Sequence, residues 1–260
     1  MKLTVVTACY NAEKTIRATI ESFLSQTHLD RELLVIDGAS RDGTLAAVAE
    51  YGSKDIRVVS EIDAGVYDAM NKGLRLFTGD AVGFLNADDT FHDNHALSRI
   101  AHALESAEIV YGDLLMVTDH VSKTVVRDWR AGRFSPGAFQ RGWQPPHPGF
   151  FVRRSVVNRV GEFDLTYVTA ADYDFMLRAM LLDDVRIAYL PHVLADFMMG
   201  GVSTKDWRAT LRGTVETLRS RQLHLSAPPV DAAVFLRLAR RLFQIRQVRN
   251  YYRRRPNRNS

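Results

Sequence analysis

Two patterns of apolar residues alternate along the first hundred positions of the chain. Short, nearly continuous apolar runs are typical of strands covered on both faces, and they occur at 3–8, 32–37, 56–60 and 80–86. Between these runs, apolar side chains recur at helical spacing and predict helices at 16–24, 45–49, 65–77 and 92–105. This alternation favours βαβ units with right-handed crossovers, so an α/β fold with a mostly parallel sheet is expected.

Local signals refine these elements and continue the pattern. Asn11 and Asp42 precede the first two helices and are predicted to cap them. After residue 105 the rhythm changes, and the Pro- and Gly-containing stretch 135–149 is predicted to be irregular. Further extended segments are expected at 109–117, 123–129, 150–153 and 185–190, with helices at 156–160 and 172–182. Gly200 and Gly201 are expected to serve as the hinge of a lid.

Composition narrows the class of protein. The chain has 260 residues, of which 46% are hydrophobic and 25% charged, as expected for one large globular domain, alone or with an appendage. The single cysteine, Cys9, excludes an internal disulfide and a Cys-rich zinc module. The first residues lack a signal-peptide core, and no apolar run has the length of a membrane span. A cytoplasmic location is therefore expected.

Two adjacent carboxylates end the apolar run at 80–86. Asp88 and Asp89 follow the strand, and ligands bind at the carboxyl ends of parallel strands. Carboxylate oxygens suit Mg2+ or Mn2+ carrying a substrate phosphate. A simpler interpretation stays open at this point, because Asp is also a common cap of the helix that follows.

Five segments, in this order, resemble the motifs of family 2 glycosyltransferases with the GT-A fold. They are Thr-Ala-Cys-Tyr-Asn at 7–11, Val-Ile-Asp-Gly-Ala-Ser-Arg-Asp-Gly-Thr at 35–44, Asp-Ala-Gly-Val-Tyr-Asp-Ala-Met-Asn-Lys-Gly at 63–73, Phe-Leu-Asn-Ala-Asp-Asp at 84–89 and Ala-Asp-Tyr-Asp at 171–174. The resemblance covers residues 1–205 and implies a Rossmann-like α/β domain flanked by helices. It also implies an inverting enzyme that moves a sugar from a nucleotide diphosphate donor, with UDP favoured. The implied acceptor is a glycan or a lipid-linked hydroxyl in polysaccharide or glycolipid biosynthesis.

The resemblance implies roles for individual residues. Asp172 is expected to be the catalytic base, and Asp89 and Asp88 are expected to hold a divalent cation, Mn2+ or Mg2+. Contacts with the donor are expected from residues at strand ends and in the loops that follow: Thr7, Ala8, Tyr10, Asn11, Asp37, Ser40, Asp63, Asn71, Asn86, Ala87, Asp88 and His147. Two positions depart from the family pattern, because Asn86 and Ala171 stand where acidic residues are frequent.

These roles match what glycosyl transfer requires. The diphosphate leaving group gains negative charge that a divalent cation neutralises, and the acceptor hydroxyl needs a carboxylate base. Structural interpretations stay open beside the functional ones. They are a helix cap for Asp172, a turn residue for Asp37, a solvated face for Asn71, a backbone contact for His147 and a buried anchor, in place of a sugar platform, for Trp143.

The end of the chain is basic and amphipathic. Between 231 and 260 there are nine arginines and one acid, and apolar residues recur at helical spacing over 232–252. Such a helix either lies on an anionic membrane surface or docks on the catalytic domain with its arginines outward. Nucleic acid is not an expected partner, because no reader motif accompanies the basic patch. The predicted division is a GT-A domain at 1–225 and a basic tail at 226–260.

Two other functions are weighed against the glycosyltransferase. A sugar nucleotidyltransferase shares the α/β frame and the metal carboxylates, but it requires a Gly-rich basic loop where this chain has Ala8-Cys9-Tyr10-Asn11. A non-catalytic module that binds nucleotide or glycan is favoured by Asn86 and Ala171. The carboxylates of Asp88, Asp89 and Asp172 argue against it.

Overall fold

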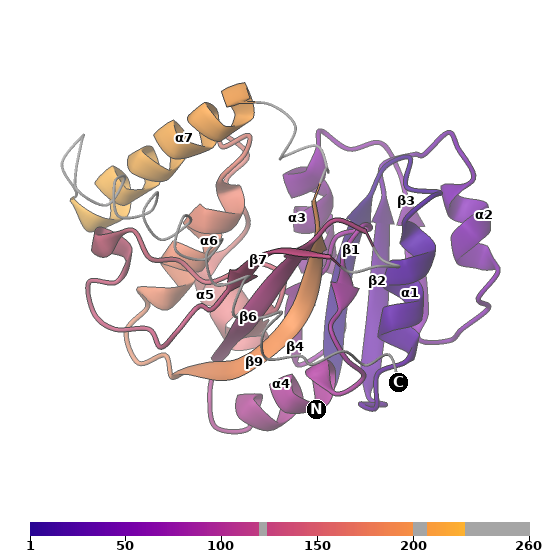
Figure 1. The fold of residues 1–260 in the computed structure, drawn as a ribbon, viewed down its shortest axis with the longest axis horizontal. Helices are drawn as coiled ribbons and strands as arrows, with labels where there is room; N and C mark the ends of the chain where they lie inside the picture. The colour runs from indigo at the N-terminus through magenta and orange to yellow at the C-terminus, as the bar shows by residue number, and fades with distance from the viewer. Residues whose placement is uncertain (120–123, 200–206, 227–260) are drawn as a thin grey trace.

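One nine-stranded sheet dominates the computed structural model, which describes residues 1–119, 124–199 and 207–226. Within the described residues, the strand order is β3-β2-β1-β4-β8-β6-β9-β5, and β7 pairs with β6 outside this path (Figure 1). The strands are β1 Leu3–Cys9, β2 Arg31–Asp37, β3 Ile56–Ser60, β4 Ala81–Phe84, β5 Thr90–Phe91, β6 Ile109–Val117, β7 Val125–Trp129, β8 Phe150–Arg153 and β9 Ile187–Met198.

Helices cover both faces of this sheet. They are α1 Ile16–Leu24, α2 Thr44–Ala49, α3 Val66–Leu76, α4 Ala96–Leu104, α5 Arg154–Val160, α6 Ala171–Met180 and α7 Trp207–Leu225, with a 3-10 turn at Phe139–Arg141. Figure 1 shows α7 beside α6, at the opposite end of the molecule from α2. No helix among the described residues combines the length and the apolar character needed to cross a membrane.

The first half of the sheet is parallel, as the alternating pattern predicts. β1 pairs in parallel with β2 and β4, and β2 pairs in parallel with β3. Alternate residues of one strand enter two different cores. Val5 and Leu33 pack on the side of α1, α2 and α4, whereas Val6 and Leu34 pack on the side of α3, α5 and α6. Because both faces are covered, the strands are apolar at nearly every position.

The second half of the sheet is mixed. β8 runs antiparallel to β4 and to β6 and so joins the two halves. β6 and β9 are parallel over their length, while β7 and β5 pair with them in antiparallel orientation. The α/β class is confirmed, and the parallel pairs are concentrated in the first half.

The close approach of α3 to β1 depends on one glycine. A Cβ atom placed on Gly73 would collide with both γ-carbons of Val6. The missing side chain therefore lets the helix lie directly on the central strand. Met70, about one turn before Gly73, and Leu74, directly after it, are buried in the same core.

Several expected boundaries differ from the structure. The prediction that Asn11 caps the first helix is wrong, because α1 begins at Ile16 and Asn11 has a left-handed backbone with φ 51°. The N-cap of α2 is Gly43 and not the predicted Asp42, although Asp42 accepts a hydrogen bond from the N–H of Thr44, the first residue of the helix, at 3.0 Å. β9 extends eight residues beyond the predicted end at Leu190. The proposed hinge at Gly200–Gly201 and the tail from 227 lie outside the described residues.

Candidate active site

The carboxyl ends of β1 and β4 form a topological switch point in the sheet. From β1 the chain crosses to β2 on one side, while β4 pairs with β1 on the other. In open α/β sheets the crevice at such a point is the usual ligand site. Leu85 donates its N–H to the Val6 carbonyl at 3.0 Å, which places the acidic loop Asn86–Asp89 beside the end of β1.

The loops after β1 and β2 form one hydrogen-bonded unit. Asn11 donates its N–H to the Ser40 hydroxyl at 2.8 Å and accepts from the N–H of Arg41 at 2.9 Å. Ala12 donates its N–H to the Thr44 hydroxyl at 2.8 Å. Ala39, like Asn11, has a left-handed backbone, which a non-glycine residue adopts only where its surroundings hold it. This unit brings Tyr10, Asn11 and Ser40, three of the predicted donor contacts, to one edge.

The carboxylate of Asp37 holds this unit together through several hydrogen bonds. This carboxylate is fully buried and accepts hydrogen bonds from the Ser40 N–H at 3.0 Å, the Ser40 hydroxyl, the Ser60 hydroxyl at 2.6 Å and the Cys9 thiol at 3.6 Å. Burial acts to raise the pKa of Asp37, but the hydrogen bonds from Ser40 and Ser60 outweigh it and the pKa is lowered. Four donors occupy the lone pairs of this carboxylate. The turn role left open for Asp37 is therefore the one that its contacts support.

The two carboxylates of the acidic loop have different surroundings. Asp89 is fully buried, where its Oδ1 accepts from the Met198 N–H at 3.0 Å and its Oδ2 accepts from the Asn86 side-chain amide at 2.9 Å. The Thr19 hydroxyl binds the Asp89 carbonyl at 2.7 Å and so ties the loop to α1. Asp88 is only partly buried. Of the two, Asp88 has the more accessible carboxylate, while Asp89 supports the loop from inside.

A divalent cation fits this pair of side chains. Burial, and then the negative charge of Asp88, raises the pKa of Asp89 well above its usual range, and a bound cation would relieve both effects. Mg2+ and Mn2+ sites commonly use one or two protein carboxylates and complete their shell with waters and substrate phosphates. Among the described residues, no group of three or more His, Cys, Asp or Glu side chains is placed to hold a metal ion.

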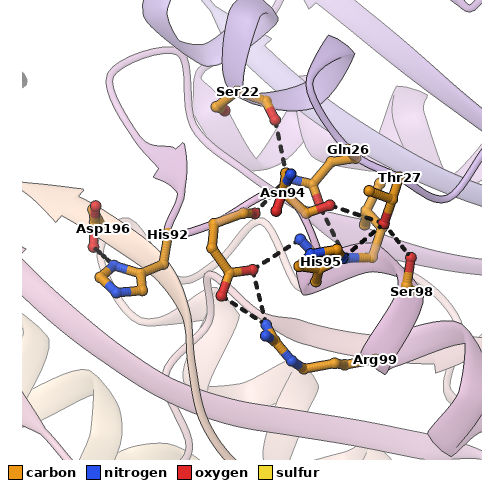
Figure 2. Close-up of polar contacts among 11 residues, drawn as sticks. Ser22, Gln26, Thr27, His92, Asn94, His95, Ser98, Arg99 and Asp196 are labelled. Carbon is orange, nitrogen blue, oxygen red and sulfur yellow. Dashed lines mark hydrogen bonds and ion pairs between the residues drawn. The ribbon is translucent and has the colours of Figure 1, made fainter.

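Polar contacts also anchor the chain that leaves the acidic loop toward α4, as Figure 2 shows. The Gln26 side chain donates to the Asp93 carbonyl at 2.7 Å and accepts from the Leu97 N–H at 3.0 Å. His92 pairs through Nδ1 with the buried carboxylate of Asp196 at 2.6 Å. These contacts connect the segment after α1 with the start of α4, and the segment before α4 with β9.

Asp172 lies in the first turn of α6, with its side chain partly buried. The N-cap of this helix is Ala170, so the capping interpretation of Asp172 is wrong. The Tyr67 hydroxyl of α3 donates a hydrogen bond to Oδ1 of Asp172 at 3.2 Å. Burial, and then the charge of Asp172, raises the pKa of Tyr67, so the phenol remains a donor at neutral pH.

His147 packs against two aromatic rings, those of Phe84 and Phe163. Its ring stacks on Phe84 of β4 at a centroid distance of 5.2 Å and meets Phe163 edge-on at 6.1 Å. The side chain is buried, and its Nε2 has no hydrogen-bond partner among the described residues. Burial lowers the pKa of His147, and the charge of Asp172 opposes this effect. The buried Nε2 is therefore a neutral polar atom that a ligand could satisfy.

The remaining residues singled out in the sequence are of two kinds. Some lie near the carboxyl ends of the strands beside the candidate site, and others make buried structural contacts. Thr7 and Ala8 end β1, and the carboxylate of Asp63 lies over Gly38, where an added Cβ would come within 2.5 Å of it. Asn71 is buried and exchanges two hydrogen bonds with the backbone of Phe163, at 2.9 and 2.8 Å, so the solvated-face interpretation is wrong. Trp143 is a buried anchor whose indole N–H binds the Ala131 carbonyl at 2.6 Å.

Sequence reasoning missed three residues of this region. Tyr67 lies inside the third motif, yet its partner is 105 positions away and no local spacing indicates it. Ser60 is the last residue of β3, and its hydroxyl binds Asp37 on the adjacent strand β2. Glu216 of α7 binds the turn in front of α6. Ser60 could have been found from the sequence, because it is a polar residue at the carboxyl end of a parallel strand, where ligand sites are usual.

Comparison with known proteins agrees with this arrangement. Residues 4–161 match the family described as Glycosyl transferase family 2. A PGL/p-HBAD biosynthesis glycosyltransferase of Mycobacterium bovis (strain BCG / Pasteur 1173P2) is 30% identical over 206 residues, which cover 76% of this chain and 78% of the relative. An uncharacterized glycosyltransferase of Mycobacterium tuberculosis (strain CDC 1551 / Oshkosh) is 32% identical over 188 residues, 69% of each chain.

Solved structures share the fold. The crystal structure of S. aureus TarS 1–349 has a TM-score of 0.67 at 19% identity, covering 92% of this chain and 71% of that one. The mannosyltransferase PcManGT from Pyrobaculum calidifontis, solved with GDP-Man and Mn2+, has a TM-score of 0.65 at 18% identity, covering 98% and 76%. With the family match over more than half of the residues, these likenesses establish that the chain belongs to glycosyl transferase family 2 and has the GT-A fold.

Proposed function

We propose that this chain is an inverting, metal-dependent transferase that moves a sugar from a nucleotide diphosphate donor to an acceptor hydroxyl. The donor site is the switch point between β1 and β4, bordered by Thr7–Asn11, Ser40, Asp63 and the acidic loop. Asp172 is the base that removes the acceptor proton as its oxygen attacks the anomeric carbon. A single carboxylate, on the face opposite the leaving group, is sufficient for inversion.

One observation supports this proposal most directly. The ring of His147 stacks on Phe84, two residues before the acidic loop, and the charge of Asp172 acts against burial on the pKa of His147. Donor phosphates and acceptor base must lie within one small site, because the reacting atoms of donor and acceptor meet there. The free Nε2 of His147 is well suited to bind the diphosphate.

Asp88, with Asp89 behind it, would hold the divalent cation, whose charge neutralises the departing diphosphate. Asp88 meets the ion more readily because it is the more accessible of the two carboxylates. Asn86, in place of a third carboxylate, binds Asp89 and so positions the loop. Tyr67 holds Asp172 toward the acceptor.

The related proteins suggest the kinds of substrate. TarS was solved with UDP and with UDP-GlcNAc, and PcManGT with GDP-Man and Mn2+. The mycobacterial relative is named for PGL/p-HBAD biosynthesis. For this chain we favour a UDP-sugar donor and a glycan or lipid-linked acceptor in glycolipid or polysaccharide biosynthesis. The enzyme would work in the cytoplasm, with residues 226–260 as a basic segment suited to the anionic inner face of the membrane.

Calorimetric titration with UDP, GDP and dTDP, with and without Mn2+, tests the donor site. We expect one nucleotide to bind with Mn2+ and to bind at least tenfold more weakly without it. Asp88→Asn should abolish the metal effect. Asp89→Asn should also lower the melting temperature, because it alters two buried hydrogen bonds.

The outcomes separate the candidate functions. Binding of GDP or dTDP in place of UDP would keep the reaction class and change the donor. Binding of a nucleotide without turnover of any nucleotide sugar would favour the non-catalytic module. Absence of metal-dependent binding to all three nucleotides would overturn the proposed transferase.

A further inference from the structure

One face of α7 carries three polar residues at helical spacing. Glu216, Ser220 and His224 stand at i, i+4 and i+8 and therefore lie on one side of the helix. All three contact the segment 168–174, which ends in the first turn of α6. Ser220 and His224 both bind Oδ1 of the buried Asp174, at 2.8 and 3.0 Å. This face of α7 is thus fitted to the start of the helix that carries Asp172.

The carboxylate of Glu216 has the most extensive contacts of the three. It accepts hydrogen bonds from the N–H groups of Val168 at 3.0 Å, Thr169 at 2.8 Å and Ala170 at 2.9 Å. The Thr169 hydroxyl adds a fourth at 2.9 Å. The N–H groups of three consecutive residues, 168–170, thus donate to one carboxylate that comes from another helix.

Glu216 holds the chain that enters α6, because its backbone partners are the N-cap residue Ala170 and the two residues before it. The N-cap, Ala170, has no side chain that could accept a hydrogen bond. Helix N-termini favour negative charge, and Glu216 brings its charge to the start of α6 from another helix. Asp172 is two residues beyond Ala170, so its direction depends on how this turn is held.

From these contacts we infer that Glu216 is a positioning residue for Asp172, and that α7 is part of the working catalytic domain. The inference rests on the proposed role of Asp172 as the base. Two contacts from different elements then fix the base, because Tyr67 binds its carboxylate directly and Glu216 fixes the backbone before it. A base displaced by about 1 Å loses up to about a hundredfold in rate.

The test compares Glu216→Ala, Glu216→Gln and the control Ser220→Ala in the full chain. Ser220→Ala removes one contact between α7 and Asp174 but leaves the 168–170 turn intact. For Glu216→Ala we expect kcat to fall about ten- to a hundredfold, with KM for the donor and Kd for UDP within about twofold of wild type. Glu216→Gln, which keeps one acceptor oxygen, should recover part of kcat. Ser220→Ala should keep kcat near the wild-type value.

Amide hydrogen exchange gives a second measurement that needs no turnover. The amides of 168–170 should exchange at least about tenfold faster in Glu216→Ala, and those of α3 should not change. An unchanged kcat together with unchanged exchange would overturn the inference, as would equal losses of kcat in Glu216→Ala and Ser220→Ala. If wild type transfers no sugar, the proposed function fails, and exchange alone still decides whether Glu216 holds the turn.

Discussion

Tyr67 and Asp172, which are 105 positions apart in the chain, meet through a 3.2 Å hydrogen bond from the phenol to the carboxylate. The contact joins the first turn of α3, which connects β3 to β4, to the first turn of α6. One hydrogen bond thus connects the third motif with the candidate base.

Tyr67→Phe should therefore lower kcat about tenfold, because a hydrogen bond to a charged group is worth about 1.5–3 kcal/mol. The affinity for nucleotide and Mn2+ should not change, since the acidic loop keeps its contacts. Steady-state kinetics and calorimetry measure the two quantities. Tyr51→Phe is a matched control, because Tyr51 also donates to a carboxylate, that of Glu21, on the far side of the sheet. Equal losses in the two variants would contradict the prediction.

Asp172→Asn should remove general-base catalysis and lower kcat about a hundred- to ten-thousandfold. UDP binding with Mn2+ should persist, because Asp172 lies in α6, outside the loops that form the donor site. Asp174→Asn provides a contrast. Asp174 is buried and holds Arg178, Ser220 and His224, so its loss should lower the melting temperature. Full activity in Asp172→Asn would show that another group is the base.

Asp37→Asn tests the acid stability of the site. The folded-state pKa of Asp37 is lowered, so its ionised form stabilises the fold above the unfolded pKa of about 3.9, and this contribution disappears as the pH falls through the folded value. The variant should lose about 1–3 kcal/mol of unfolding free energy at pH 7 and show a weaker decline toward pH 3. Urea unfolding at several pH values measures both.

Asp30→Asn, at an exposed carboxylate that pairs with the N-terminal ammonium at 3.3 Å, gives a comparison at the surface. Parallel stability curves for wild type and Asp37→Asn would contradict the prediction. If Asp37→Asn instead lost only UDP affinity, a direct contact between Asp37 and the nucleobase would be supported.

Gly73→Ala should destabilise the protein by about 1–3 kcal/mol, although alanine in place of a helical glycine ordinarily stabilises by about 1 kcal/mol. The added methyl would collide with Val6 of the central strand. Val6→Ala should therefore lose less stability in the Gly73→Ala background than alone, and a double-mutant cycle measures the coupling. Gly213→Ala in α7, whose nearest neighbour is 3.4 Å away, should be neutral or stabilising. Additive effects of Gly73→Ala and Val6→Ala would exclude the collision.

The sequence-based prediction succeeded where structure is determined locally. The apolar runs that became β1, β2 and β4 are buried at every position, so the local pattern indicates them, and β3 was predicted at its observed bounds. β5 has two residues and exists only because β9 pairs with it. α7 is a mostly polar helix held by contacts with the segment 168–174, and no apolar stripe indicates it.

For the candidate site, the sequence predicted where residues lie in the fold more readily than which residues they contact. The motifs placed Asp37, Asp88 and Asp89 at strand ends, which is where the structure has them. The difference between a buried Asp89 and a partly exposed Asp88 depends on Met198 and Asn86, one of which is 109 positions away. The roles of Asp88 and Asp172 stay predictions that the experiments above decide.

The central place of β8 has a consequence for synthesis. β4 can pair with its second neighbour, β8, only after residues 150–153 have left the ribosome. β5 can pair with β9 only after residues 187–198 have been synthesised. A nascent chain of the first 149 residues therefore exposes the edge of an apolar parallel strand, a form prone to pairing with other chains. Translation pauses or truncations between residues 85 and 150 should make this protein dependent on chaperones, whereas completion of β8 closes the edge.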